Sequence, residues 1–143
     1  MRILGLDLGS KTIGVALSDE AQTIAMPLTT IKRTGKDLQA LLGLCVEHGV
    51  SSIVVGMPIN MDGSIGSAGL SAQGFMERLK GASGLAVTAW DERLSTVAVT
   101  RTLIEADMSR EKRKKAVDKL AASYILQGYL DSLRYSEGSD VED

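Results

Sequence analysis

Three places in this sequence carry acidic residues where the surrounding pattern calls for apolar ones. Asp7 interrupts the run 3–8, in which the other residues are Ile, Leu or Gly. A strand that is covered on both faces has apolar side chains throughout, and a carboxylate there is costly unless a cation or a hydrogen-bond donor meets it. Asp7 is therefore either a turn-capping residue before Gly9 or a metal or phosphate ligand, and its position at the carboxyl end of a strand favours the ligand.

Asp118 repeats the anomaly on a helix. The apolar residues of the predicted helix 114–133 recur at helical spacing, and Asp118 falls inside the arc that they form. Ala121 and Ala122 are small enough to let this helix approach a sheet closely and bring the carboxylate to a strand end. The alternatives are a buried salt bridge and an apolar arc that ends before Asp118.

The third place is the pair Asp91 and Glu92, directly after a predicted strand over 85–90. If this strand runs parallel to the first, one of the two acids arrives at the same edge of the sheet as Asp7. Adjacent residues point to opposite sides of a strand, so only one acid is expected to face the site, with Glu92 favoured and Asp91 as the alternate. Both acids could instead supply favourable charge to the start of a helix opened by Ser95.

Converging carboxylates repel one another unless cations neutralise them, so Asp7, Glu92 and Asp118 predict a metal site. Oxygen ligands alone select hard ions, here Mg²⁺ or Mn²⁺, over zinc. Two such ions about 3.5 to 4 Å apart can activate a water and stabilise the leaving oxygen of a phosphodiester displacement, and a one-metal site stays open. Asp19 is excluded as a ligand because it would lie roughly 20 Å from Asp7 along the hairpin, at about 3.3 Å per residue. The only histidine, His48, is interpreted as structural or solvent-facing.

The elements that must position these residues follow the order β-β-β-α-β-α-β-α-α. The turn Gly9-Ser10-Lys11 is too short for anything but an antiparallel hairpin, and Pro27 places the third strand at an edge or a bulge. This three-stranded antiparallel meander and two later parallel strands predict an α/β fold, a mixed five-stranded sheet with helices on both faces. The Gly-rich stretch 57–69 leaves the sheet at the same edge and is either a mobile connection or a substrate-gripping loop. The predicted strands cover 3–8, 12–18, 23–31, 52–56 and 85–90, and the predicted helices cover 38–48, 70–80, a segment from Ser95 and 114–133.

Composition predicts one cytoplasmic globular domain. With 143 residues, of which 44% are hydrophobic, the chain can form one core, and we assign residues 1–135 to a nuclease domain and 136–143 to an acidic C-terminal tail. Cys45 is the only cysteine, so a disulfide or a CxxC zinc or redox site is excluded and a reducing cytoplasm is the expected setting. The first residues resemble no export signal, and no apolar run approaches about 18 residues, so no membrane segment is expected.

Basic residues near the predicted site indicate a polyanionic partner. The net charge is −2, but without the four acids of the tail the 16 basic residues exceed the remaining acids by two. The segment 110–115 carries five basic residues in six positions and is either a solvated helix start or a phosphate-contacting loop. Phosphate contacts are assigned to Lys11, Arg93 and this cluster, which includes Arg113 and Lys114. Because aromatic residues make up only 3% of the chain, a structured nucleic acid is favoured over a single strand.

Four segments in this order resemble the YqgF/RuvX family: Gly5 to Ala16, Val55 to Ser64, Asp91 to Thr96, and Asp118 to Ala122 with Ile125 to Leu130. The resemblance implies a ribonuclease H-like fold, a bacterial cytoplasmic setting and a nuclease that matures the 5′ end of precursor 16S ribosomal RNA, with Holliday junction resolution as an older proposal. The acidic positions of the family fall on Asp7, Glu92 and Asp118, and Thr96 joins the predicted substrate-binding residues. Ribonucleases H and junction resolvases place their second acid near the fourth strand, whereas here that strand ends in Gly56-Met57-Pro58. Glu92 must therefore reach across a neighbouring strand.

Two other classes of protein stay open. The segment from Asp7 to Ala16 also resembles the first phosphate loop of actin-like ATPases and sugar kinases, but those proteins close two such lobes around ATP and 143 residues supply one. A non-catalytic RNA-binding assembly factor could keep the fold and use the basic loop. The substrate is structured RNA or branched DNA, and the protein is expected to be a monomer or a weak homodimer.

Overall fold

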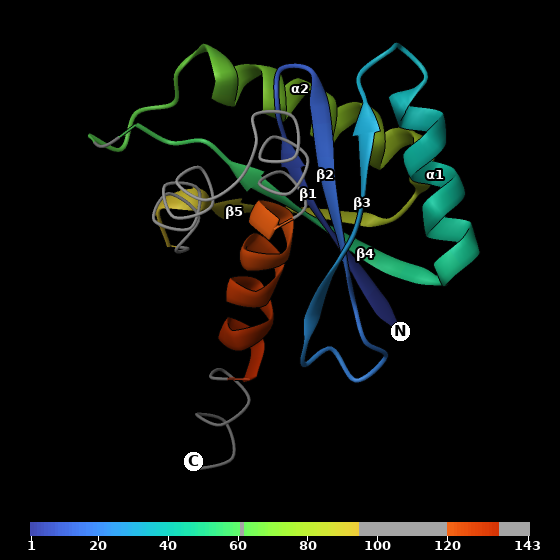
Figure 1. The fold of residues 1–143 in the computed structure, drawn as a ribbon. Coiled ribbons are helices and arrows are strands. Elements are labelled where there is room, and N and C mark those ends of the chain that lie inside the picture. Colours follow the sequence, from blue (N-terminus) through green and yellow to red (C-terminus); the bar gives the residue numbers. More distant parts are fainter. Residues whose placement is uncertain (61, 95–119, 135–143) are drawn as a thin grey trace, which may run out of the picture.

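The computed structural model describes residues 1–60, 62–94 and 120–134, which contain a five-stranded sheet (Figure 1). The strands are β1 (Arg2–Leu8), β2 (Thr12–Ser18), β3 (Ala25–Lys32), β4 (Val50–Met57) and β5 (Ala86–Asp91). Their order in the sheet is β3-β2-β1-β4-β5. The first three strands form an antiparallel meander, β4 runs parallel to β1, and β5 runs parallel to β4. The predicted mixed sheet is therefore confirmed.

The hairpin between β1 and β2 turns through the predicted three residues. In its register, Asp7 pairs with Gly14, and Leu8 pairs with Ile13. β3 is an edge strand, and its register with β2 shifts at Pro27, which has no N–H to donate to the ladder. The edge position and the bulge predicted from this proline are both present.

Asp19 closes the turn between β2 and β3. Its carboxylate accepts hydrogen bonds from the backbone nitrogens of Thr23 and Ile24, at 2.8 and 3.0 Å, and from Thr23 Oγ1 at 2.8 Å. Hydrogen bonds from Ile24 and Thr23 lower the pKa of Asp19 to about 2. This turn delays the start of β3 to Ala25, whereas the sequence predicted a start at Thr23.

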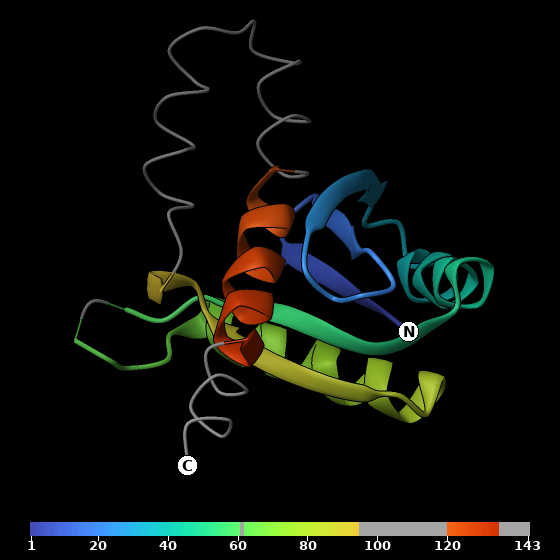
Figure 2. The ribbon, with the colours of Figure 1, turned by 90° about the horizontal axis from the view of Figure 1, so that it is seen from below.

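Two helices cover one face of the sheet, and the helical segment 120–134 covers the other (Figures 1 and 2). α1 (Asp37–His48) ends at Gly49, whose φ of 63° is the left-handed conformation that favours glycine. α2 (Ser67–Ser83) begins before the predicted start at Leu70. The sequence did not indicate the earlier start because the first residues of the helix are small and give no apolar periodicity. The part of the predicted helix 114–133 before residue 120, and the helix predicted from Ser95, lie outside the described residues. None of the helices within the described ranges is long and apolar enough to cross a bilayer.

The alternation of side chains along the strands divides the core into two layers. Leu4 and Leu6 of β1 belong to the layer under α1 and α2, whereas Ile3 belongs to the layer under helix 120–134. Asp7 lies four positions after Ile3, so both side chains point to the same side of the strand. It therefore lies on the face of the sheet that helix 120–134 covers.

Helix 120–134 is held closely against this face. A Cβ added to Gly5 would stand 2.7 Å from the Cβ of Leu126, so the helix approaches β1 to a distance that only a glycine permits. At the edge of the sheet, Gln127 Oε1 accepts a hydrogen bond from the backbone nitrogen of Ala25 at 2.9 Å, and its Nε2 donates to the Thr23 carbonyl at 3.0 Å. The helix thus contacts both the middle of the sheet and the start of β3.

Candidate active site

Asp7 is buried at the carboxyl end of β1, with only 3% of its surface exposed. Leu6 pairs with Val55 of the neighbouring strand β4, so Asp7 and Gly56 each stand one residue further along. The residue beside Asp7 therefore has no side chain. This arrangement leaves space next to a buried carboxylate, on the face that helix 120–134 covers.

Glu92 occupies the space above Gly56. It follows β5 directly and begins a short 3-10 helix (Glu92–Leu94). A Cβ added to Gly56 would lie 3.0 Å from Glu92 Oε1 and 3.2 Å from its Cγ. The Glu92 side chain thus extends from the end of β5 over β4, whose end is open to it because Gly56 is a glycine. The structure brings Asp7 and Glu92 to one edge of the sheet.

Asp91, the alternate candidate, binds Arg93 instead. Its Oδ2 accepts a hydrogen bond from Arg93 Nη2 at 2.8 Å, and both of its oxygens lie within 3.1 Å of Arg93 Nε. The hydrogen bonds from Arg93 lower the pKa of Asp91 below its ordinary value. Of the two neighbouring acids, the geometry therefore favours Glu92 for the site and gives Asp91 a structural partner.

Arg93 also holds the loop that follows β4. Its Nη1 donates to the Asn60 carbonyl at 3.3 Å, while the amide nitrogen of Gly63 donates to the same carbonyl at 2.9 Å. Asp62 Oδ1 accepts hydrogen bonds from the backbone nitrogen and the hydroxyl of Ser64, at 2.9 and 2.6 Å. The sequence predicted that Arg93 contacts substrate phosphates. In the structure its guanidinium donates hydrogen bonds to the Asp91 carboxylate and to the Asn60 carbonyl.

Asp91→Asn is expected to loosen the loop 58–66 without unfolding the protein. The uncharged Asn side chain would weaken the ion pair that orients the Arg93 guanidinium toward the Asn60 carbonyl. Because the folded-state pKa of Asp91 is lowered, the pair is intact above the ordinary Asp pKa and is lost as the pH falls through the lowered value. The measurement is the rate of limited proteolysis within this loop at neutral and acid pH.

The matched control for this experiment is Asp131→Asn. It removes an ion pair of the same kind, in which Arg134 Nη2 lies 2.7 Å from Asp131 Oδ1 on helix 120–134. The control should leave proteolysis of the loop at the parental rate. Equal rates in the parent and in Asp91→Asn would show that the pair does not hold the loop.

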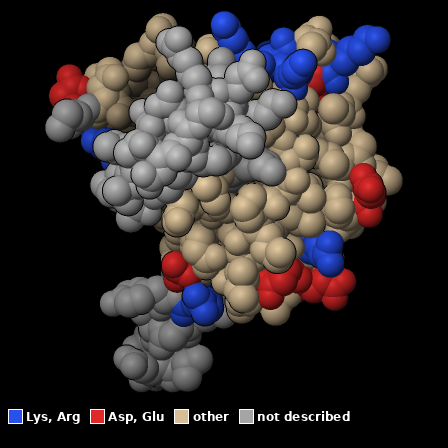
Figure 3. Space-filling model, in the orientation of Figure 1, with Lys and Arg blue, Asp and Glu red and all other residues tan. Residues whose placement is uncertain are grey.

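Of the five other predicted site residues, the structure describes only Lys11. Lys11 is exposed in the turn between β1 and β2, on an edge of the molecule where Lys and Arg side chains gather (Figure 3). Within the described ranges, no group of three or more His, Cys, Asp or Glu residues is arranged to hold a metal ion. The predicted residues that lie outside the described part of the chain are Thr96, Arg113, Lys114 and Asp118.

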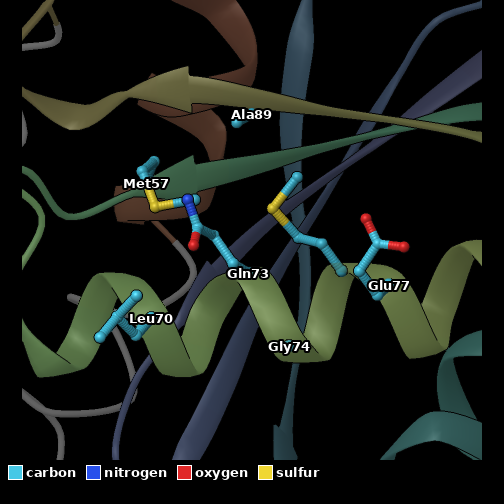
Figure 4. Close-up of a pocket in the computed structure, with 7 residues that line it drawn as sticks. Met57, Leu70, Gln73, Gly74, Glu77 and Ala89 are labelled. Carbon is cyan, nitrogen blue, oxygen red and sulfur yellow. The ribbon is translucent and has the colours of Figure 1, made fainter.

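A groove on the opposite face of the sheet is separate from these carboxylates (Figure 4). It lies between α2 and the ends of β4 and β5, and Met57, Leu70, Gln73 and Ala89 are among the residues that line it. Met57 follows Gly56 in the strand, so its side chain points to the other side of the sheet. The groove therefore does not belong to the edge that carries Asp7 and Glu92.

Sequence reasoning missed two contributors to this arrangement. Gly56 was noted only as the end of a strand, although a glycine in a Val/Ile-rich strand is a signal for the close approach of another group. The bond from Arg93 to Asn60 had no sequence signal, because 33 residues separate the partners.

Comparison with known proteins supplies a family, two relatives and a shared fold. Residues 1–132 match the profile of the RuvX family, described as "Holliday junction resolvase". A Clostridium perfringens protein named "Putative pre-16S rRNA nuclease" is 54% identical over 135 residues, which cover 93% of this chain and 98% of that protein. A Myxococcus xanthus protein with the same name is 51% identical over 136 residues, covering 94% of this chain and 90% of that protein. T. thermophilus RuvC in complex with a Holliday junction substrate has a TM-score of 0.60 at 14% identity, covering 92% of this chain and 96% of that chain, and shares the ribonuclease H-like fold.

Proposed function

Since the chain belongs to the RuvX family, a family of nucleases, we propose that it cleaves precursor 16S ribosomal RNA at its 5′ end with the help of divalent metal ions. The observation that carries this proposal is the pair of carboxylates at one edge of the sheet. Asp7 is buried beside Gly56, and Glu92 reaches over the same glycine from β5. Asp118, which lies two positions before the described segment 120–134 in the sequence, is the proposed third acid.

The donor set fits a hard divalent cation, and we assign Mg²⁺ or Mn²⁺, as one ion or two, to Asp7, Glu92 and Asp118. All three are carboxylates, and burial of Asp7 to 3% exposure makes a nearby cation favourable. When bound, the metal supplies an activated water and stabilises the charge on the leaving oxygen of the phosphodiester.

The chain's own residues fix the positions of these carboxylates. β1 holds Asp7 in the middle of the sheet, where the backbone is paired on both sides. The ion pair between Asp91 and Arg93 fixes the end of β5, from which Glu92 extends. The bond from Arg93 to Asn60 keeps the loop after β4 beside the same edge, where it can contact substrate.

RNA is favoured over branched DNA as the substrate. Relatives at 54% and 51% identity over nearly the whole chain are named for precursor 16S rRNA, whereas the junction-bound RuvC is 14% identical and shares only the fold. Holliday junction resolution remains the second candidate because the family description names it. A non-catalytic RNA-binding factor is the third.

Incubation with two substrates side by side separates these candidates. We expect a precursor rRNA fragment with its 5′ extension to be cut in Mg²⁺ or Mn²⁺, to survive in EDTA, and to be cut again when metal is restored. A four-way DNA junction of matched length should stay intact. Symmetrical cutting of the junction alone would favour resolution, binding without cutting would favour the assembly factor, and cutting in EDTA would remove the metal from the proposal.

A further inference from the structure

A band of basic residues follows the same edge of the sheet beyond the carboxylates. The turn between β1 and β2 and the loop between β3 and α1 form it. Figure 3 shows Lys and Arg side chains gathered along the edge where these loops lie in Figure 1, whereas most Asp and Glu side chains of this face lie at its left, right and lower borders. We call this band the basic rim, and its members are Lys11, Lys32, Arg33 and Lys36.

Arg33 holds the two loops of the basic rim together. Its backbone nitrogen donates to the Lys11 carbonyl at 2.9 Å, and its Nη1 donates to the Gly9 carbonyl at 2.9 Å. Its guanidinium lies over the ring of Phe75, 5.3 Å from the centroid, and its Nε is 3.5 Å from Asp37. Arg33 therefore connects the two loops of the basic rim, and it also forms an ion pair with Asp37, the first residue of α1.

The three lysines of the basic rim differ from Arg33 because they are exposed. Lys11, Lys32 and Lys36 all face solvent, and their ammonium groups make no hydrogen bond or ion pair with other residues in the described part of the chain. Exposed positive charges on neighbouring loops create a local positive potential, which attracts a polyanion. The chemistry of the basic rim fits phosphate groups.

The spacing between the basic rim and the carboxylates fits one bound nucleic acid. Asp7 pairs with Gly14, and Gly14 pairs with Thr30, so the residues of β3 lie two strands from Asp7, about 10 Å at about 4.8 Å per strand. Lys32 stands two residues further along β3. At about 3.3 Å per residue along the strand, the Cα of Lys32 therefore lies roughly 12 Å from that of Asp7, so a nucleic acid placed over the carboxylates also reaches the basic rim.

We propose that the basic rim binds the phosphate backbone of a double-helical part of the substrate, beside the bond that is cut. This inference rests on the proposed function and adds a surface on β3 and α1 that lies outside the acidic site. Phosphate contacts fix register and orientation but carry no base information. The basic rim therefore contributes affinity and register on the substrate, but no recognition of its base sequence.

The test compares two double variants of equal charge. Lys32→Gln with Lys36→Gln removes two positive charges from the basic rim, and Lys80→Gln with Arg134→Gln removes two from the ends of α2 and helix 120–134. Binding to a blunt RNA duplex is measured in EDTA over a series of salt concentrations. Removing one lysine that touches a phosphate should reduce the slope of log affinity against log salt by about 0.9, so the rim variant should bind about 50-fold more weakly at about 0.1 M salt.

The control variant should keep the parental slope, and thermal unfolding should show that both variants fold. Equal losses of affinity in both variants would overturn the proposal, since they would reflect net charge alone. An unchanged slope in the rim variant would overturn it as well. A parent that fails to cut RNA but shows the rim-dependent slope would contradict the proposed function and leave the basic rim standing.

Discussion

Asp7→Asn is expected to reduce RNA cleavage by about 10³-fold, because the amide cannot replace a carboxylate as a ligand of a hard divalent cation. A bound metal ion stabilises the charge of the transition state by several kcal/mol. Each loss of about 1.4 kcal/mol slows the reaction tenfold, so losing this stabilisation corresponds to about 10³-fold. The side chain keeps its size in a position that is only 3% exposed, so packing should be preserved. Single-turnover cleavage in saturating Mg²⁺ measures the effect.

A second readout for the same variant does not depend on cleavage. A cation that binds only the folded protein raises its unfolding temperature, so metal binding can be followed by thermal unfolding. Asp7→Asn should lose the rise in unfolding temperature that added Mn²⁺ gives the parent relative to EDTA. Asp131→Asn, an exposed change of the same type, should cut RNA at the parental rate. Parental cleavage by Asp7→Asn would remove this residue from the site.

Gly56→Ala is expected to impair catalysis more than a single methyl group ordinarily does. The new Cβ would lie 2.5 Å from Ile125 Cδ1 and 3.0 Å from Glu92 Oε1. The end of the isoleucine side chain can shift, at a cost of about 1 to 3 kcal/mol in the free energy of unfolding. Glu92 must leave its place above β4, and a misplaced ligand lowers the rate by about 10²-fold. Denaturant unfolding and single-turnover cleavage measure the two effects separately.

Two further variants separate packing from catalysis in this experiment. Gly43→Ala makes the same change in α1, where an added Cβ meets nothing within 4 Å, so it should keep full activity and gain about 0.5 to 1 kcal/mol. Combining Gly56→Ala with Ile125→Val makes room in the core and should recover stability without recovering activity. Recovery of both would mean that Gly56 serves only the packing of helix 120–134.

The sheet was predictable because its signals are local. Each strand is a short apolar run, the three-residue turn after β1 allows only a hairpin, and Pro27 marks an edge or a bulge by its chemistry. Element boundaries were less predictable where a tertiary contact sets them. β3 begins at Ala25 because Asp19 binds the residues before it, and α2 begins in small residues that show no apolar periodicity.

The candidate site was predictable only in part, for a related reason. Asp7 stands out within its own strand, so local pattern is enough to select it. The choice of Glu92 over Asp91 depends on Gly56, which is distant in sequence and becomes a neighbour through the register of β4 and β5. The partners of Arg93 depend on the same assembly. The assignment of Asp118 stays a prediction.

The amide of Gln127 has a consequence for the behaviour of this protein at high concentration. β3 ends the sheet on one side, and Ile24 and Met26 beside that border are 58% and 61% exposed, which makes it a place where a foreign strand could attach. Gln127 already occupies the backbone nitrogen of Ala25 and the carbonyl of Thr23. The Gln127 amide thus satisfies two backbone groups that an added strand would otherwise bind at this end of β3.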